Sequence, residues 1–258
     1  MLAWIPRGLT KGRITTRYPR IREEPPDHYH GPVAVLDFLN ADRELERCCP
    51  TGAIAVDDQR RLSLDRGRCI ACGECTRTAP HRFAFTHRYE TAARTRQALV
   101  VGGVDRDDPG PVRRTLAEQA RALGRSIHVR HIDTGSDGAE EWEIQALWNP
   151  YYDIQRLGFF LTAAPRHADI LMATGVVTAP MRAPLQRTWA VMPEPKALIA
   201  VGTDACSGGL TADGEVTGAG IDAVLPVDVY VPGSPPPPIA ILHGLLLAVG
   251  LLREGSDR

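Results

Sequence analysis

The chain has 258 residues, a length that predicts one or two domains at roughly 150 residues per domain. Hydrophobic residues make up 43% and charged residues 24%, which is typical of soluble globular proteins and excludes a disordered or fibrous chain. The formal net charge of -1 lacks the basic excess of a nucleic-acid-binding protein, so we expect no nucleic-acid partner.

Residues 1–32 are rich in Arg, Pro and Tyr, and we interpret them as an arm that docks on another surface. They carry no typical export signal, because the apolar start is short and Pro6 interrupts it. We therefore expect a cytoplasmic protein.

Residues 33–95 form a candidate small domain made of short segments separated by Gly and Pro. Within it, residues 53–56 and 61–64 are predicted to pair as strands. A body of this size needs a staple, such as a metal site, to fold stably. Residues 96–125 follow as a linker, in which the periodicity predicts a helix at 112–123.

Residues 126–258 alternate short β-rich runs with helical stretches. Such alternation predicts parallel strands joined by right-handed crossovers, and therefore a doubly wound, flavodoxin-like parallel α/β domain. Ligands bind such sheets at the carboxyl ends of the strands. The predicted strands are 127–132, 169–174, 197–201 and 227–231, and the predicted helices are 139–148, 179–190 and 239–252.

The last predicted helix is the longest apolar stretch of the chain. Its 14 residues fall short of the about 20 that a membrane span requires. We expect a buried helix and no transmembrane segment of the chain's own.

Five of the six cysteines fall within 28 residues. In a reducing cytoplasm such clustering favours metal binding over disulfides. Cys69, Cys72 and Cys75 have the C-x2-C-x2-C spacing with which a tight loop holds a [4Fe–4S] cluster. In two-cluster ferredoxins the fourth ligand comes from the other cysteine run, and Cys49, followed by Pro50, supplies it here.

The other run of a two-cluster ferredoxin is missing. Counting back from Cys49 with the same spacing gives Leu45, Asp42 and Leu39, and Ala79 stands at the fourth position. These four positions are the whole ligand set of one cluster.

We therefore predict one [4Fe–4S] cluster as the cofactor. Zinc held by the same thiolates is the alternative, because both metals accept soft sulfur ligands. Cys48 is interpreted as a small buried hydrophobic residue. The predicted iron ligands are Cys49, Cys69, Cys72 and Cys75.

The N-terminal part resembles a known family over residues 1–100. The segment 8–19, followed by the cysteine-rich segment, resembles the two-cluster ferredoxin subunit of respiratory complex I and of formate hydrogenlyase-type hydrogenases. The similarity is strongest at 15–19 and at the cysteines. It implies a bacterial ferredoxin-like domain at 33–95.

The C-terminal part resembles a second family over residues 126–252, the small subunit of group 4 [NiFe] hydrogenases and the homologous B-type subunit of complex I. The resemblance implies that the chain is a fusion of two subunits. The matching segments are 132–136 with 141–144, 149–153, 165–169 with 173–175, 193–209, and 227–233 with 235–236.

In that second family, four cysteines bind a [4Fe–4S] cluster. Their positions in this chain fall on Asp137, Glu140, Asp204 and Ser234, so the resemblance implies a lost cluster. Three carboxylates in one place are costly unless they pair with arginine, meet water or bind a hard cation. We interpret Cys206, two residues beyond one of these positions, as a non-ligand.

The resemblances imply an iron–sulfur electron-transfer subunit of a hydrogenase-like or NADH–quinone oxidoreductase-like complex, with no active site of its own. The implied partners are a hydrogenase or complex I catalytic large subunit and membrane-arm subunits. The implied location is peripheral, on the cytoplasmic face of the membrane. One alternative is a scaffold subunit in which the cluster is only a folding staple, and another is an iron or redox sensor.

Overall fold

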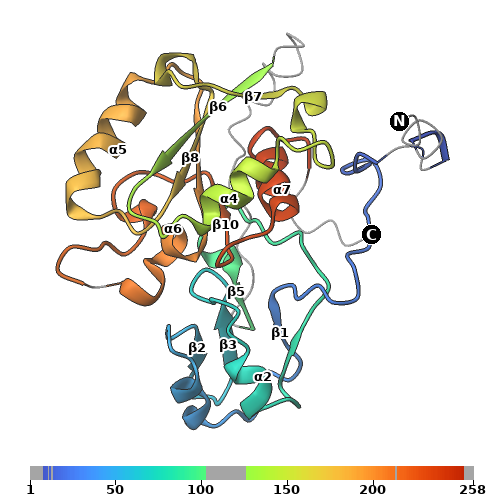
Figure 1. Cartoon of the computed structure of the whole chain (residues 1–258). Coiled ribbons are helices and arrows are strands. Elements are labelled where there is room, and N and C mark those ends of the chain that lie inside the picture. The colour runs from blue at the N-terminus through green and yellow to red at the C-terminus, as the bar shows by residue number, and fades with distance from the viewer. Residues whose placement is uncertain (1–7, 11, 13, 103–125, 213, 253–258) are drawn as a thin grey trace.

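The computed structural model describes residues 8–10, 12, 14–102, 126–212 and 214–252. The helix expected at 112–123 lies outside them. The described residues form two stacked bodies (Figure 1), a smaller one that carries the clustered cysteines and a larger α/β body.

The larger body is built on five parallel strands. Their order across the sheet is β10-β9-β8-β6-β7. Numbered along the chain and read from the β7 edge, this order is 2-1-3-4-5, the flavodoxin-like arrangement. The predicted parallel α/β sheet is confirmed, and β7 is the strand that the sequence did not predict. The strands are β6 (Ile127–Asp133), β7 (Phe159–Leu161), β8 (Ile170–Thr174), β9 (Ala197–Val201) and β10 (Val229–Val231).

Helices cover both faces of this sheet. One face packs against α4 (Ala139–Ala146) and α7 (Pro238–Ala248), and the other against α5 (Ala179–Val191) and α6 (Thr203–Ser207). Because both faces are covered, all five residues of β8 are buried. Short 3-10 helices lie at Ile154–Leu157, Pro165–His167, Gly209–Thr211 and Ile221–Ala223.

Helix α7 is buried along almost its whole length, as the apolar sequence predicted. Two core clusters meet at the sheet, and the side chains of β8 alternate between them: Met172 faces α7, whereas Leu171 faces α5. In the described part of the chain, no helix combines the length and apolar character of a membrane span.

The smaller body contains two small antiparallel sheets. The predicted strand pair is confirmed as β2 and β3. Strand β5 pairs with β3, so the sheet continues into the segment that was expected to be linker. The elements are β1 (Val33–Val35), which pairs with β4 (Phe83–Phe85), then β2 (Ile54–Val56), β3 (Leu62–Asp65), β5 (Val100–Val101), α2 (Glu74–Thr78) and 3-10 helices at Arg43–Cys48 and Gln97–Leu99.

The described part of the N-terminal arm lies on the chain's own α/β body. The Thr16 N–H donates to the carbonyl of Tyr151 at 2.8 Å, and the Arg156 guanidinium donates to the carbonyl of Tyr18 at 2.7 Å. The Tyr18 ring is buried in the core on the α7 side of the sheet. The surface on which the arm docks is therefore supplied in cis.

Arg96 links the two bodies, and an ion pair within the smaller body holds its side chain. The Arg96 guanidinium donates to both carboxylate oxygens of Asp65, at 2.7 and 2.6 Å, and its Nε donates to the carbonyl of Cys206 on α6 at 3.2 Å. Nearby, Ala93 and Tyr230 exchange two backbone hydrogen bonds. These contacts fix the cysteine-rich body against the edge of the sheet where α6 begins.

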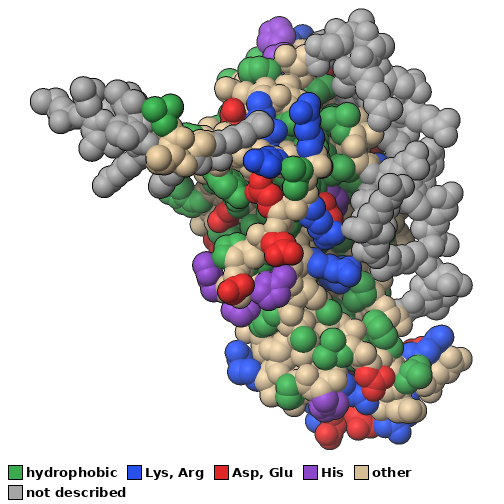
Figure 2. Space-filling view, turned by 90° about the vertical axis from the view of Figure 1, so that its right-hand side faces the viewer, with side chains coloured by type: hydrophobic (Ala, Val, Ile, Leu, Met, Phe, Trp, Pro, Cys, Tyr) green, Lys and Arg blue, Asp and Glu red, His purple; other side chains and the backbone are tan. Residues whose placement is uncertain are grey.

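On the face shown in Figure 2, Lys and Arg side chains interleave with Asp and Glu side chains. The smaller body carries exposed ion pairs, such as Arg61 with Asp57 and Arg77 with Glu74. Exposed pairs of this kind contribute little stability, about 1 kcal/mol or less each.

Candidate metal centre

Five cysteines line one pocket of the smaller body, and the four predicted ligands among them come from three chain segments. Cys49 follows the 3-10 helix at 43–48, Cys69 and Cys72 lie in the loop between β3 and α2, and Cys75 lies in α2. The pocket has a volume of about 310 Å³ including its mouth. All four are free thiols. The structure therefore brings the predicted ligand set together.

Backbone N–H groups point at three of the four sulfurs. The Ala53 N–H donates to Cys49 Sγ at 3.2 Å, and the N–H groups of Ala71 and Thr76 bond to the sulfurs of Cys69 and Cys75. Ala71 adopts φ +53, which is rare for a residue with a side chain and bends the loop tightly. Donors directed at sulfur stabilise thiolates and tune the potential of a bound cluster.

Without a bound cation, the thiols of Cys69 and Cys75 favour the protonated form. Burial raises the pKa of Cys69, and it raises the pKa of Cys75 to about 11, with the other cysteines adding to the effect. Only thiolates bind iron, so loading the site releases protons and depends on the positive charge of the metal.

The other two cysteines differ from each other. Cys48 lines the same pocket, and its thiol donates to the carbonyl of Leu45 at 3.0 Å. Cys206 lies inside the core on the α5 side of the sheet, where burial raises its pKa. Its position in the core accords with the interpretation of Cys206 as a non-ligand.

The donor chemistry of the pocket fits a cubane cluster, because its cysteines supply soft sulfur ligands. In a [4Fe–4S] cluster each cysteine binds a different iron, so the four thiolates surround a volume. A single zinc ion would instead need its thiolates about 2.3 Å from one point. In the part of the chain that the structure describes, no three His, Cys, Asp or Glu side chains are grouped so as to hold one metal ion.

The four implied lost-cluster positions follow strands or begin helices at the carboxyl edge of the large sheet. Asp137 follows β6, Glu140 lies in the first turn of α4, Asp204 lies in α6 and Ser234 follows β10. The three carboxylates act on one another electrostatically. Ser234 lies next to Gly233, whose carbonyl accepts a hydrogen bond from the N–H of Thr203 at 2.7 Å. Thr203 begins α6 and precedes Asp204.

Glu140 is the buried member of the group, with 3% of its surface exposed. Burial, together with the charges of Asp204, Asp137 and Glu141, raises its pKa to about 7. Its Oε2 has no hydrogen-bond partner among the described residues. The arginine pairing expected for these carboxylates is not found in the described ranges, and neither is a cation-binding group.

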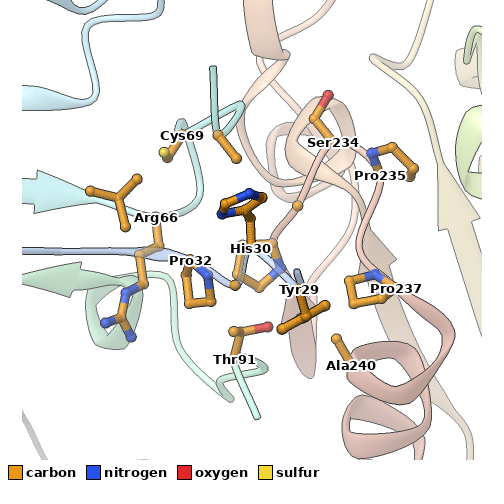
Figure 3. A pocket seen from close by; sticks show the side chains of 15 residues that line it. Tyr29, His30, Pro32, Arg66, Cys69, Thr91, Ser234, Pro235, Pro237 and Ala240 are labelled. Carbon is orange, nitrogen blue, oxygen red and sulfur yellow. The ribbon is translucent and has the colours of Figure 1, made fainter. Parts of the chain in front are cut away.

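The two sites are adjacent. The Thr203 hydroxyl, at the start of α6, donates to the carbonyl of Cys69 at 3.1 Å. A cavity of about 560 Å³, including its mouth, lies between the bodies and is lined by both Cys69 and Ser234. Figure 3 shows His30 between these two residues. The ring of His30 lies against that of Phe85, with centroids 5.1 Å apart.

The sequence analysis did not identify three residues that contribute to these sites. Ala71 matters through its backbone conformation, Thr203 through a contact across the junction, and Asp65 through its ion pair with Arg96. Ala71 alone had a hint, because it lies inside the C-x2-C spacing.

Residues 138–248 match the family described as NADH ubiquinone oxidoreductase, 20 Kd subunit. The chain is 42% identical over 138 residues to formate hydrogenlyase subunit 7 of Escherichia coli K12, covering 54% of each chain. It is 40% identical over 139 residues to the probable membrane-bound hydrogenase subunit mbhJ of Pyrococcus furiosus, covering 54% of this chain and 83% of that protein. The chain thus spans about half the length of the first relative and most of the second.

Among solved structures, the chain is similar to one from the membrane-bound sulfane sulfur reductase, an archaeal respiratory membrane complex. The identity is 26%, the TM-score is 0.46, and the match covers 54% of this chain and 77% of the other. The matched α/β half defines a subunit of the complex I and hydrogenase type. The chain belongs to the family of the 20 Kd subunit of NADH ubiquinone oxidoreductase.

Proposed function

We propose that this chain is an iron–sulfur electron-transfer subunit of a membrane-associated hydrogenase-like or NADH–quinone oxidoreductase-like complex, and that it carries one [4Fe–4S] cluster. One observation carries the proposal: four cysteines line one pocket, and backbone N–H groups point at three of the sulfurs. When bound, the cluster supplies one-electron redox chemistry.

The residues around the pocket have separate roles in this proposal. Cys72 is exposed, so the surface around it is where a redox partner would approach. Cys75 is buried and anchors the pocket floor to α2. Cys69 is joined through its carbonyl to Thr203 and so to the α/β body.

We also propose that the chain fuses a ferredoxin-like domain to the 20 Kd-type domain. The arm of the first part docks on residues 150–156 of the second, so an interface that separate subunits would form between chains is formed within one. The relatives are named as a membrane-bound hydrogenase subunit and a formate hydrogenlyase subunit, which supports partner subunits for this chain. We propose that these partners are a large catalytic subunit and membrane-arm subunits at the cytoplasmic face.

The cluster is tested by anaerobic purification of the full chain, with iron, sulfide and zinc measured per chain and EPR recorded after dithionite reduction. We expect about four irons and a reducible cluster signal. Cys72→Ser should lose most of the iron and the signal. Cys206→Ser, the matched control from the core, should keep both. Zinc in place of iron, or full iron in Cys72→Ser, would overturn the proposal.

One observation favours a scaffold role as the second candidate. All four positions of the implied second cluster carry oxygen groups, so an electron leaving the cysteine pocket meets carboxylates on the α/β side. The assembled complex separates the two roles. If Cys72→Ser assembles and supports full turnover, the cluster is a staple; if the variant assembles without turnover, the cluster carries electrons.

A further inference from the structure

Glu140 is the most unusual ionisable group of the described chain. Its side chain is almost fully buried, and its Oε2 has no hydrogen-bond partner among the described residues. Its Oε1 lies against Gly202, where an added Cβ would stand only 2.5 Å away. A carboxylate held in this way is costly, and the neutral acid is the cheaper form.

The charged groups that face Glu140 are all acidic. Asp137 comes from the loop before α4, Glu141 from α4 itself, and Asp204 from α6. Helix α7 also packs against α4, and its titratable residue, His243, accepts a hydrogen bond from the Ala92 N–H instead. The pKa of Glu140 is raised to about 7, so its protonation is balanced near neutrality.

Glu140 is also close to the cysteine pocket. Gly202, which it contacts, is followed by Thr203, whose hydroxyl donates to the carbonyl of Cys69. Consecutive Cα atoms are about 3.8 Å apart, so the path from the carboxyl to the cysteine loop is on the order of 10 Å. Over that distance, in the partly buried junction, one added electron changes the proton affinity of a carboxyl by about tenfold.

We infer that Glu140 is a proton-binding site coupled to the redox state of the cluster held by the four cysteines. One electron from a low-potential one-electron donor reduces the cluster, and one proton from water binds the Glu140 carboxylate at Oε2. Reoxidation returns the electron to an acceptor and the proton to water. This inference rests on the proposed function, since it requires a reducible cluster.

A bound cation is the competing way to neutralise these acids. Asp137, Glu140 and Asp204 do not form a group that could hold a metal ion among the described residues. The proton at Glu140 therefore explains the buried carboxyl without any further ligand.

The test is a redox titration of the cluster in the full chain, followed by EPR, at several pH values on both sides of 7. In the wild type we expect the midpoint potential to fall as pH rises, over a total of about 59 mV for a tenfold change in proton affinity. Glu140→Gln should remove this dependence. Glu143→Gln, a half-buried glutamate on the same helix, is the matched control and should keep it.

A second readout is infrared difference spectroscopy of the reduced and oxidised protein. A protonated carboxyl band should appear on reduction in the wild type and be absent in Glu140→Gln. A reversible cluster with a pH-independent potential in the wild type, or an unchanged dependence in Glu140→Gln, would overturn the inference alone. A chain without any reducible cluster would instead overturn the proposed function.

Discussion

The cysteine pocket and the carboxylate group lie side by side but manage charge in opposite ways. In the cysteine pocket, backbone N–H groups point at sulfurs, so the fold is prepared for thiolates that bind a cation. At the replaced positions, Glu140 lies among other acids, and its Oε2 has no partner among the described residues. These features support a metal at the first site, as we propose, and a proton at the second, as we infer.

If this contrast holds, the α/β body keeps the backbone of a cluster site and differs from one only in its side chains. The strongest test of the contrast is a variant with cysteine at all four positions: Asp137→Cys, Glu140→Cys, Asp204→Cys, Ser234→Cys. Iron per chain should rise from about four to about eight, measured after anaerobic reconstitution.

The matched control leaves Ser234 in place and changes the other three positions. It should bind the second cluster weakly, because one iron lacks its thiolate. If the fourfold variant gains no iron, the loops at this edge no longer hold the geometry of a cluster site.

The ion pair between Arg96 and Asp65, beside the junction of the two sites, should give the next largest effect, a loss of folding stability. Asp65→Asn leaves the Arg96 guanidinium half-buried without its counterion, and we expect the free energy of unfolding to fall by about 3 kcal/mol. Asp58→Asn is the control, because its pair with Arg43 is exposed and should be worth about 0.5 kcal/mol or less. Urea denaturation measures both, and equal losses would show that the joint is not held by this pair.

The cysteine pocket could be predicted from the sequence because three of its cysteines lie close together in the chain. The spacing of Cys69, Cys72 and Cys75 defines a tight loop, and the structure places Cys49 beside it. The large sheet was readable for a similar reason, since long apolar runs such as 170–174 are buried on both faces. Strand β7, at the sheet edge with three residues, left too short a pattern.

The properties of the carboxylate group could not be read in this way. The resemblance located Glu140 and Asp204, but the absence of a partner for Glu140 Oε2 depends on which side chains the fold brings near it. The sequence contains many arginines that could pair with these carboxylates. Arg96, which lies at this junction, is paired with Asp65 instead. Pairs between residues far apart in the sequence leave no periodicity or spacing from which they could be predicted.

Two buried groups, His243 and Glu140, should give opposite pH dependences of similar size. Burial, together with Arg22 and Arg94, lowers the pKa of His243 to about 4. Its stabilising contribution is present above the ordinary histidine pKa and is lost as pH falls from about 6.5 to 4, for a total of about 3 kcal/mol. His243→Asn keeps an acceptor for the Ala92 N–H and should remove this acid destabilisation in urea denaturation at pH 6.5 and 4.5.

Glu140 should act in the other direction with an effect of similar size. Its pKa is raised from about 4.5 to about 7, so its contribution to stability is present below pH 4.5 and is lost as pH rises through 7, for a total of about 3 kcal/mol. Glu140→Gln should therefore gain stability relative to the wild type at pH 8 and not at pH 4.5. Because the two windows overlap, the opposing terms partly cancel in the wild type, and the double variant Glu140→Gln, His243→Asn should show neither. A Glu140→Gln protein whose stability tracks the wild type across this range would mean that the carboxyl is charged at no cost, and the contrast between the metal site and the proton site would fail.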